Sequence, residues 1–114
     1  MKLNLLVIRS PDPDQLVPFY EAWGLRFAHH RHGSEPLHYA AEMNELVFEI
    51  YPCKYGQTPS IHIRLGFEME DVKNVLEKVS TSGGMILQDL QQTEFGKVAI
   101  VQDPEGRKLE LKEI

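Results

Sequence analysis

The sequence predicts the same order of elements in each half of the chain: a strand, a helix and three further strands. In each half an apolar stripe with helical spacing (i, i+3, i+4, i+7) follows the first strand. The stripes are Leu16, Phe19, Tyr20 and Trp23, then Val72, Val75, Leu76 and Val79. The predicted strands are residues 3–9, 25–31, 37–42 and 46–51, then 60–67, 85–90, 97–102 and 107–112. Such a repeat predicts a single α+β domain made of two βαβββ modules, residues 1–52 and 60–114.

Each predicted module has one helix, which covers one face of its strands and leaves the other face open. Two such half-sheets facing each other form a cupped mixed sheet, whose inner wall is a natural place for a ligand. Asp12 or Asp14 is expected to cap the first helix. Pro18 requires that helix to start late, near Asp14, because a proline deeper inside removes a backbone hydrogen bond.

Composition narrows the class of protein. The 114 residues include 12 Lys and Arg against 17 Asp and Glu, a net charge of −5, which disfavours nucleic acid and anionic membranes as partners. No apolar run approaches the roughly 20 residues that span a bilayer. Cys53 is the single cysteine, so an internal disulfide is impossible and the cytoplasm is the expected compartment.

Strand alternation places three potential metal ligands on the face that the helices leave open. If Phe48, Ile50, Leu109 and Leu111 pack on the helices, then Glu49, His62 and Glu110 point the other way. One His and two carboxylates form a ligand set for a divalent metal such as Ni, Zn, Mn or Fe. Superposing the repeats pairs Glu49 with Glu110 and His62 with Leu5. The fourth related position is therefore apolar and cannot bind a metal.

Several short motifs complete the pattern. They are FY at 19–20 followed by GL at 24–25, FEIY at 48–51, IHI at 61–63, and the closing stretch DPEGRKLEL at 103–111. With these motifs the whole chain resembles the vicinal oxygen chelate superfamily, which includes glyoxalase I, extradiol dioxygenases, fosfomycin-resistance enzymes and bleomycin-binding proteins. The resemblance implies four metal ligands, from the first, fourth, fifth and eighth strands. Glu49, His62 and Glu110 match three of them, and Leu5 replaces the fourth, usually a His or another polar residue. It also implies a homodimer.

Two functions follow from the resemblance. The first is a metal-dependent lyase or isomerase acting on a substrate with vicinal oxygens, with Glu49 or Glu110 as the catalytic base. The second is a metal-free small-molecule-binding protein of the bleomycin-resistance type, in which Arg64, Lys108 and Lys112 neutralise the two carboxylates. In both cases a small molecule is the expected partner. The expected substrate-binding residues are Leu5, Tyr51, Arg64 and Lys108.

Four further histidines lie close together in the sequence. His29, His30 and His32 belong to one predicted strand, and His38 follows across the next turn. His30 and His32 share a strand face, and a hairpin would bring His38 near them. They are candidates for a second metal site, or for solvated residues at the mouth of the cup.

Overall fold

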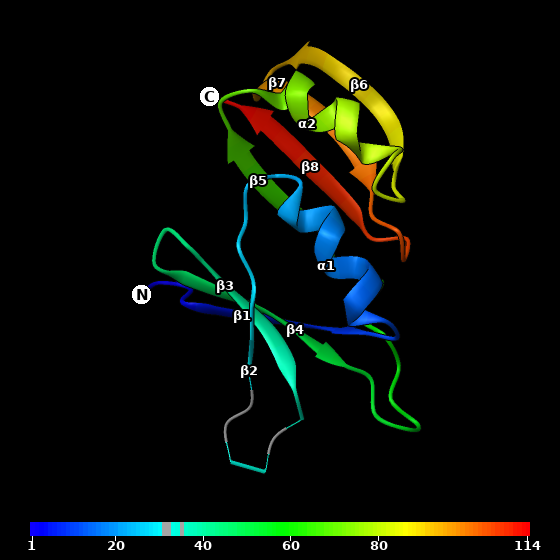
Figure 1. Cartoon of the computed structure of the whole chain (residues 1–114). Coiled ribbons are helices and arrows are strands. Elements are labelled where there is room, and N and C mark those ends of the chain that lie inside the picture. The colour runs from blue at the N-terminus through cyan, green and yellow to red at the C-terminus, as the bar shows by residue number, and fades with distance from the viewer. Residues whose placement is uncertain (31–32, 35) are drawn as a thin grey trace. The chain divides into compact units, whose positions relative to one another are not determined.

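The computed structural model describes residues 1–30, 33, 34 and 36–114, and the chain divides into two compact units, residues 1–60 and 61–114. The first unit contains β1 (Leu5–Ser10), α1 (Pro13–Glu21), β2 (Ala28–His30), β3 (His38–Met43) and β4 (Leu46–Pro52). The second contains β5 (Leu65–Met69), α2 (Val72–Val79), β6 (Met85–Thr93), β7 (Gly96–Gln102) and β8 (Lys108–Glu113) (Figure 1).

The two units share one topology. Their sheets have the strand orders β1-β4-β3-β2 and β5-β8-β7-β6. The first strand of each unit runs parallel to the last, and the other neighbours are antiparallel. The predicted fold class, α+β with two βαβββ modules of mixed sheet, is therefore confirmed.

Each helix packs its apolar stripe on one face of its own sheet. In the first unit the ring centroids of Tyr20 and Phe48 lie 5.4 Å apart, and Ile50 is fully buried. In the second unit the buried residues of α2 and of β8 include Val75 and Leu111. Because side chains alternate along a strand, the neighbouring residues Glu49 and Glu110 project from the opposite face, as predicted.

Each helix is capped at its N-terminus by an aspartate that accepts a backbone hydrogen bond. Asp12 Oδ1 accepts from Gln15 N (3.3 Å) and Asp71 Oδ1 from Asn74 N (3.1 Å). The first helix starts at Pro13, so the expected late start near Asp14 was one residue too late, and Pro18 lies inside the helix. Pro18 is exposed, so its ring is on the solvent side of α1.

Two predicted strands are shorter than expected. Residues 25–27 precede β2, which begins at Ala28, and position 31, where the predicted strand ends, lies outside the described residues. Residues 60–64 precede β5 because β8, its partner, pairs only from Leu109 opposite Leu65 onwards. Ser60 instead bonds to β1: its Oγ accepts from Arg9 N (3.0 Å), and its N donates to Arg9 O (3.1 Å). The apolar–polar alternation of residues 60–67 therefore extends beyond the strand.

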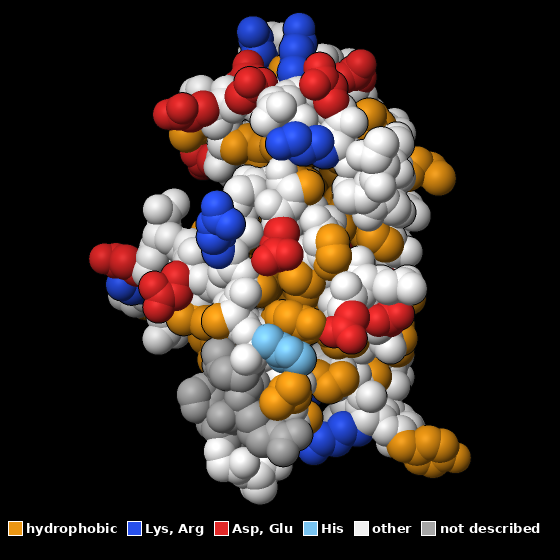
Figure 2. Space-filling model, viewed as in Figure 1, with side chains coloured by type: hydrophobic (Ala, Val, Ile, Leu, Met, Phe, Trp, Pro, Cys, Tyr) orange, Lys and Arg blue, Asp and Glu red, His pale blue; other side chains and the backbone are white. Residues whose placement is uncertain are grey.

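Charged side chains of both signs gather over α2, as Figure 2 shows. They lie on the side of this helix opposite its buried residues Val72, Val75 and Val79, as the amphipathic pattern requires. None of the helices described is long and apolar enough to cross a membrane.

Candidate functional site

The strand register corrects the superposition of the two halves. Val7 lies opposite Glu49 in the first sheet, and Gly66 lies opposite Glu110 in the second. The capping residue Asp12 comes five residues after Val7, and Asp71 comes five residues after Gly66. This alignment makes Leu5 equivalent to Arg64. The predicted pairing of Leu5 with His62 was wrong by two residues.

Glu49 belongs to a buried polar cluster in the first unit. His38 Nε2 lies 3.2 Å from Glu49 Oε2. The His38 side chain is fully buried and that of Glu49 is 14 % exposed. His38 Nδ1 lies 3.1 Å from the carbonyl oxygen of Pro36, which can only accept a hydrogen bond, so Nδ1 carries a proton.

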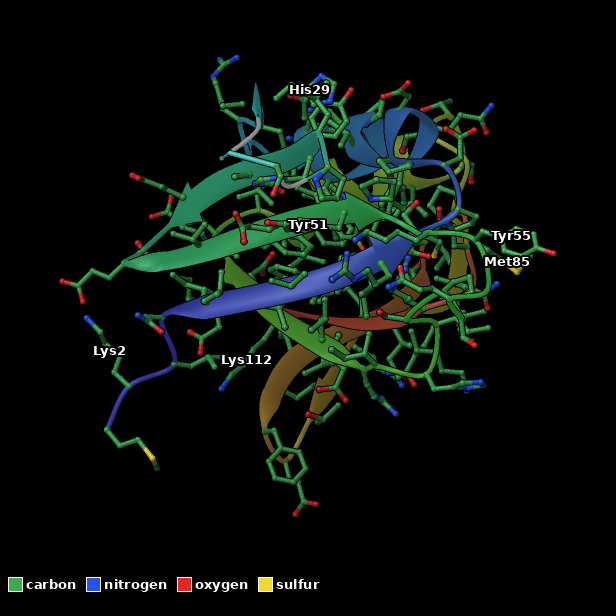
Figure 3. All side chains as sticks on the ribbon, turned by 90° about the horizontal axis from the view of Figure 1, so that it is seen from below. Lys2, His29, Tyr51, Tyr55, Met85 and Lys112 are labelled. Atoms are coloured by element: carbon green, nitrogen blue, oxygen red, sulfur yellow. The ribbon has the colours of Figure 1, made fainter. Side chains whose placement is uncertain are left out.

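Tyr51 continues this cluster across the sheet. Its ring stacks on His38, with centroids 4.1 Å apart and planes 8° apart. The guanidinium carbon of Arg9 lies 4.7 Å from the Tyr51 ring centroid, in cation–π range. Tyr51 is on β4, as Figure 3 shows. The row Arg9–Tyr51–His38–Glu49 therefore places the His38 imidazole beside the carboxylate and the Arg9 guanidinium at the Tyr51 ring.

A cavity of about 560 Å³ lies within the first unit and is open to Glu49. Ala28, Ala40 and Val47 line it with small apolar side chains, while Arg26 and Glu42 add exposed charges. Glu49 lies opposite Ala40 in the register, which leaves room above the sheet beside its carboxylate.

Glu110 has a different environment in the second unit. Arg64 Nη2 donates to Glu110 Oε1 over 2.8 Å, and the two side chains are 52 % and 49 % exposed. Exposed ion pairs of this kind contribute only about 0–1 kcal/mol, so the pair opens at little cost. This contact is the one that the metal-free alternative predicts for Arg64.

The second unit holds a larger cavity, about 910 Å³, on the face of its sheet opposite α2. Val98 and Ile100 of β7 supply apolar side chains, and Phe95, 72 % exposed, stands at the β6–β7 turn. The charged residues that line it are Glu68, Glu94, Glu110 and Lys112. Cavities of this size accommodate drug-sized molecules.

The remaining predicted residues lie elsewhere. His62 is exposed at a bend before β5, and with Arg64 and Lys108 it lines a third cavity of about 290 Å³ in the second unit. Leu5 begins β1 opposite Val47 and is 47 % exposed.

Neither unit by itself assembles the divalent metal centre that the resemblance implies. Glu49 belongs to the first unit and is paired with His38. In the second unit Glu110 is bound by Arg64, while His62 lines another cavity. The strand neighbours of the two carboxylates, Val7 and Gly66, carry no donor side chain. Among the described residues, no group of three or more His, Cys, Asp or Glu side chains is placed to hold a metal ion.

The other histidines separate by sheet face. His29 stacks on Tyr39 (centroids 4.1 Å apart), and Tyr39 lies opposite Ile50, on the helix side. His38 belongs to the opposite face, since it precedes Tyr39, so His29 and His38 do not converge. His30 lies opposite His38 in the register, and His32 is outside the described residues.

Tyr39 also links the sheet to α1. Its hydroxyl donates to Asp14 Oδ1 over 2.6 Å. That hydrogen bond is the main reason why the pKa of Tyr39 lies above its ordinary value, and partial burial and the negative charges of Asp14 and Glu21 act in the same direction.

Sequence reasoning missed His38 as the partner of Glu49, although a signal was present. Asn44 and Glu45 form a two-residue turn with φ of 47° and 70°, which places Met43 opposite Leu46. Counting back from that turn brings His38 beside Tyr51 and Ala40 beside Glu49. No comparable sequence pattern identifies the cavity residues Arg26, Glu68, Glu94 and Phe95.

Comparison with solved structures places the fold. A hypothetical protein from S. aureus superposes with a TM-score of 0.77 at 11 % identity, covering 100 % of this chain and 97 % of the other. A glyoxalase/bleomycin resistance protein/dioxygenase family enzyme from Burkholderia phytofirmans PsJN gives 0.75 at 13 % identity, covering 97 % of each chain. TnmS3, an antibiotic-binding protein from Streptomyces sp. CB03234, gives 0.75 at 17 % identity, covering 99 % and 95 %.

At these identities the likeness shows the fold alone. No curated protein matches the chain. The family model for the Glyoxalase/Bleomycin resistance protein/Dioxygenase superfamily, however, matches residues 2–111, nearly the whole sequence. Relatives of this fold include both an enzyme and an antibiotic-binding protein. The chain therefore belongs to the glyoxalase/bleomycin resistance protein/dioxygenase superfamily.

Proposed function

We propose that this protein binds a small organic molecule without a metal, in the larger, 910 Å³ cavity of the second unit. One observation carries the proposal: each carboxylate predicted to bind a metal is paired with a basic side chain of its own unit. His38 pairs with Glu49 and Arg64 with Glu110. A metal would have to displace His38 before Glu49 became a ligand, and Arg64 before Glu110 did.

The second unit's cavity suits a molecule with an apolar body. Val98 and Ile100 form an apolar surface on β7, and the exposed ring of Phe95 stands beside it. An exposed aromatic ring gains contact area when a ligand covers it, which favours binding. Glu110 and Lys112 lie two residues apart on the same face of β8 and offer one polar group of each charge.

The competing function is a metal-dependent lyase or isomerase that uses Glu49, His62 and Glu110. The two functions differ in the effect of metal ions on stability. Chelator-treated protein is heated with Ni²⁺, Zn²⁺ or Mn²⁺, and we expect no change in Tm. A metal held with useful affinity would raise Tm by more than about 5 °C, because ligand binding stabilises only the folded state. A rise of that size that disappears in Glu110→Gln would overturn the proposal.

A second measurement tests the cavity directly. Small aromatic and aliphatic compounds are screened for those that raise Tm, and the affinity of each hit is measured for Phe95→Ala. We expect about ten-fold weaker binding, because the ring forms part of the cavity wall. Tyr55→Ala is the matched control, since Tyr55 is exposed, points outward in Figure 3 and lies in the other unit. Equal affinities for the two variants would contradict the placement of the ligand.

A further inference from the structure

The 290 Å³ cavity of the second unit has a charge opposite to that of the whole protein. Its charged and titratable lining residues are His62, Arg64 and Lys108, and no acidic residue of the described part of the chain lines it. The chain carries a net charge of −5, so a basic cavity is a local exception. Ile61 and Ile63 complete the lining with apolar side chains.

The acidic residues nearest in sequence neutralise this cavity only in part, through the contact of Glu110 with Arg64. Glu105, one residue before the lining residue Gly106, is held by the buried Arg107, with Oε1 2.8 Å from Nη1. Glu110 lines the larger cavity and contacts Arg64 through Nη2. Lys108 forms no ion pair with any of the residues that the structure describes. Its ammonium group and the rest of the Arg64 guanidinium are therefore available to an added anion.

Arg64 is held loosely enough to change partners. Both members of its ion pair are about half exposed, so water can solvate the Glu110 carboxylate when Arg64 moves away. A guanidinium presents several N–H donors in one plane, which match the two oxygens of a carboxylate or the oxygens of a phosphate. The cavity thus joins a planar donor, a flexible ammonium and an apolar wall.

We propose that this cavity is an oxyanion site, which binds a small carboxylate or phosphate through Arg64 and Lys108, with His62 beside it. The two isoleucines favour an anion attached to a short apolar group. The site is distinct from the proposed ligand cavity and does not depend on it, because the anion alone serves as the probe.

Binding is measured by titrating the ¹⁵N-labelled full chain with sodium butyrate or inorganic phosphate at constant ionic strength. We expect saturable shifts of the amide signals of His62, Arg64 and Lys108 with at least one probe. Tighter binding of butyrate would identify an organic acid as the ligand class, and tighter binding of phosphate would identify a phosphate group. Absence of saturable shifts with both probes would overturn the proposal.

Charge variants identify the residues responsible. Arg64→Gln should weaken anion binding at least ten-fold, while Lys73→Gln, which removes the same charge from the exposed side of α2, should leave it unchanged. Glu110→Gln should tighten binding about three-fold or more, because it releases Arg64 from its carboxylate. Equal losses in Arg64→Gln and Lys73→Gln would show a general charge effect and contradict the site. Amide spectra outside the cavity check that each variant is folded.

Discussion

The two units place a glutamate at the same register position and surround it differently. Glu49 is 14 % exposed and its partner His38 is fully buried, whereas Glu110 and Arg64 are each about half exposed. Taking a carboxylate out of water without a partner is costly, so Glu49 depends on its contact with His38 for the fold to be stable. The pair in the second unit has water as an alternative partner. Equivalent carboxylates thus serve structure in one unit and remain available to ligands in the other.

The largest expected effect concerns the connection before the last strand of each unit. In the second unit the buried Arg107 contacts Asp103 (3.0 Å) and Glu105 (2.8 Å), whereas the first unit has only the turn at Asn44 and Glu45. Arg107→Met should lower the free energy of unfolding by about 3–5 kcal/mol, because it leaves a buried carboxylate without its cation. Urea unfolding measures this. Arg26→Met, an exposed change, should cost less than about 0.5 kcal/mol, and equal costs would contradict the role of Arg107.

The two carboxylate pairs supply the next contrast. His38→Gln should lower the free energy of unfolding by about 2–3 kcal/mol, since it leaves the Glu49 carboxylate without its partner and removes the ring stacked on Tyr51. Arg64→Gln should cost no more than about 1 kcal/mol. The double variant His38→Gln with Glu49→Gln should recover part of the loss in urea unfolding. An equal loss of unfolding free energy in His38→Gln and Arg64→Gln would contradict the structural difference between the two carboxylate pairs.

The turns before the last strands differ in backbone strain. Glu45 has a φ of 70°, where a side chain is unfavourable, while Gly106 provides the positive φ (100°) in the second unit. Glu45→Gly should therefore stabilise the protein by about 0.5–1 kcal/mol, less the small contribution of the exposed Lys2–Glu45 ion pair. Thermal unfolding measures the gain, and Lys2→Gln isolates the ion pair. If Glu45→Gly lost more stability than Lys2→Gln, the backbone at Glu45 would not be strained.

The smallest expected effect concerns how each helix is tied to its sheet. In the first unit the Tyr39 hydroxyl on the sheet donates a hydrogen bond to the Asp14 side chain on the helix. In the second unit the backbone N of Val72 on the helix donates to the Glu113 side chain on the sheet (3.2 Å). Because the pKa of Tyr39 is raised in the folded state, its contribution to stability is present below the ordinary tyrosine pKa of about 10 and is lost at higher pH. Ultraviolet titration should show that Tyr39 ionises above the ordinary tyrosine pKa.

Asp14→Asn should move that titration back towards the ordinary tyrosine value, since it removes the negative charge. Glu70→Gln, which removes a similar charge from the second unit, serves as the control and should leave the Tyr39 titration in place. An unchanged titration in Asp14→Asn would show that Asp14 is not the cause of the shift.

The sequence predicts the order of elements and the face of each strand well, because both depend on periodicity. Phe48 and Ile50 pack on the helix and Glu49 does not, as alternation requires. Strand ends were less predictable, since they depend on a partner distant in sequence. Residues 60–64 alternate like a strand, but only Leu65 onwards has a neighbour on β8.

The candidate site was harder to predict, for a related reason. Strand alternation predicted Glu49 and Glu110, but the basic group beside each comes from another strand or from the segment before one. His38 lies on β3, and Arg64 precedes β5. The assignment of Glu49, His62 and Glu110 to a metal stays a prediction that the Tm measurement tests. The three cavities follow from strand twist and turn geometry, which the residue pattern does not encode.

The two hydrogen bonds between Ser60 and Arg9 have a consequence for contacts between molecules. β1 is an edge strand, and unpaired backbone groups on such an edge invite strand addition by another chain. Here Ser60 occupies the N–H and C=O of Arg9, and Cys53 N donates to Ser10 O (2.9 Å). The other edge strand, β2, has three residues in the described part of the chain. The segment that leaves the first sheet thus closes part of that sheet's edge and protects it against aggregation.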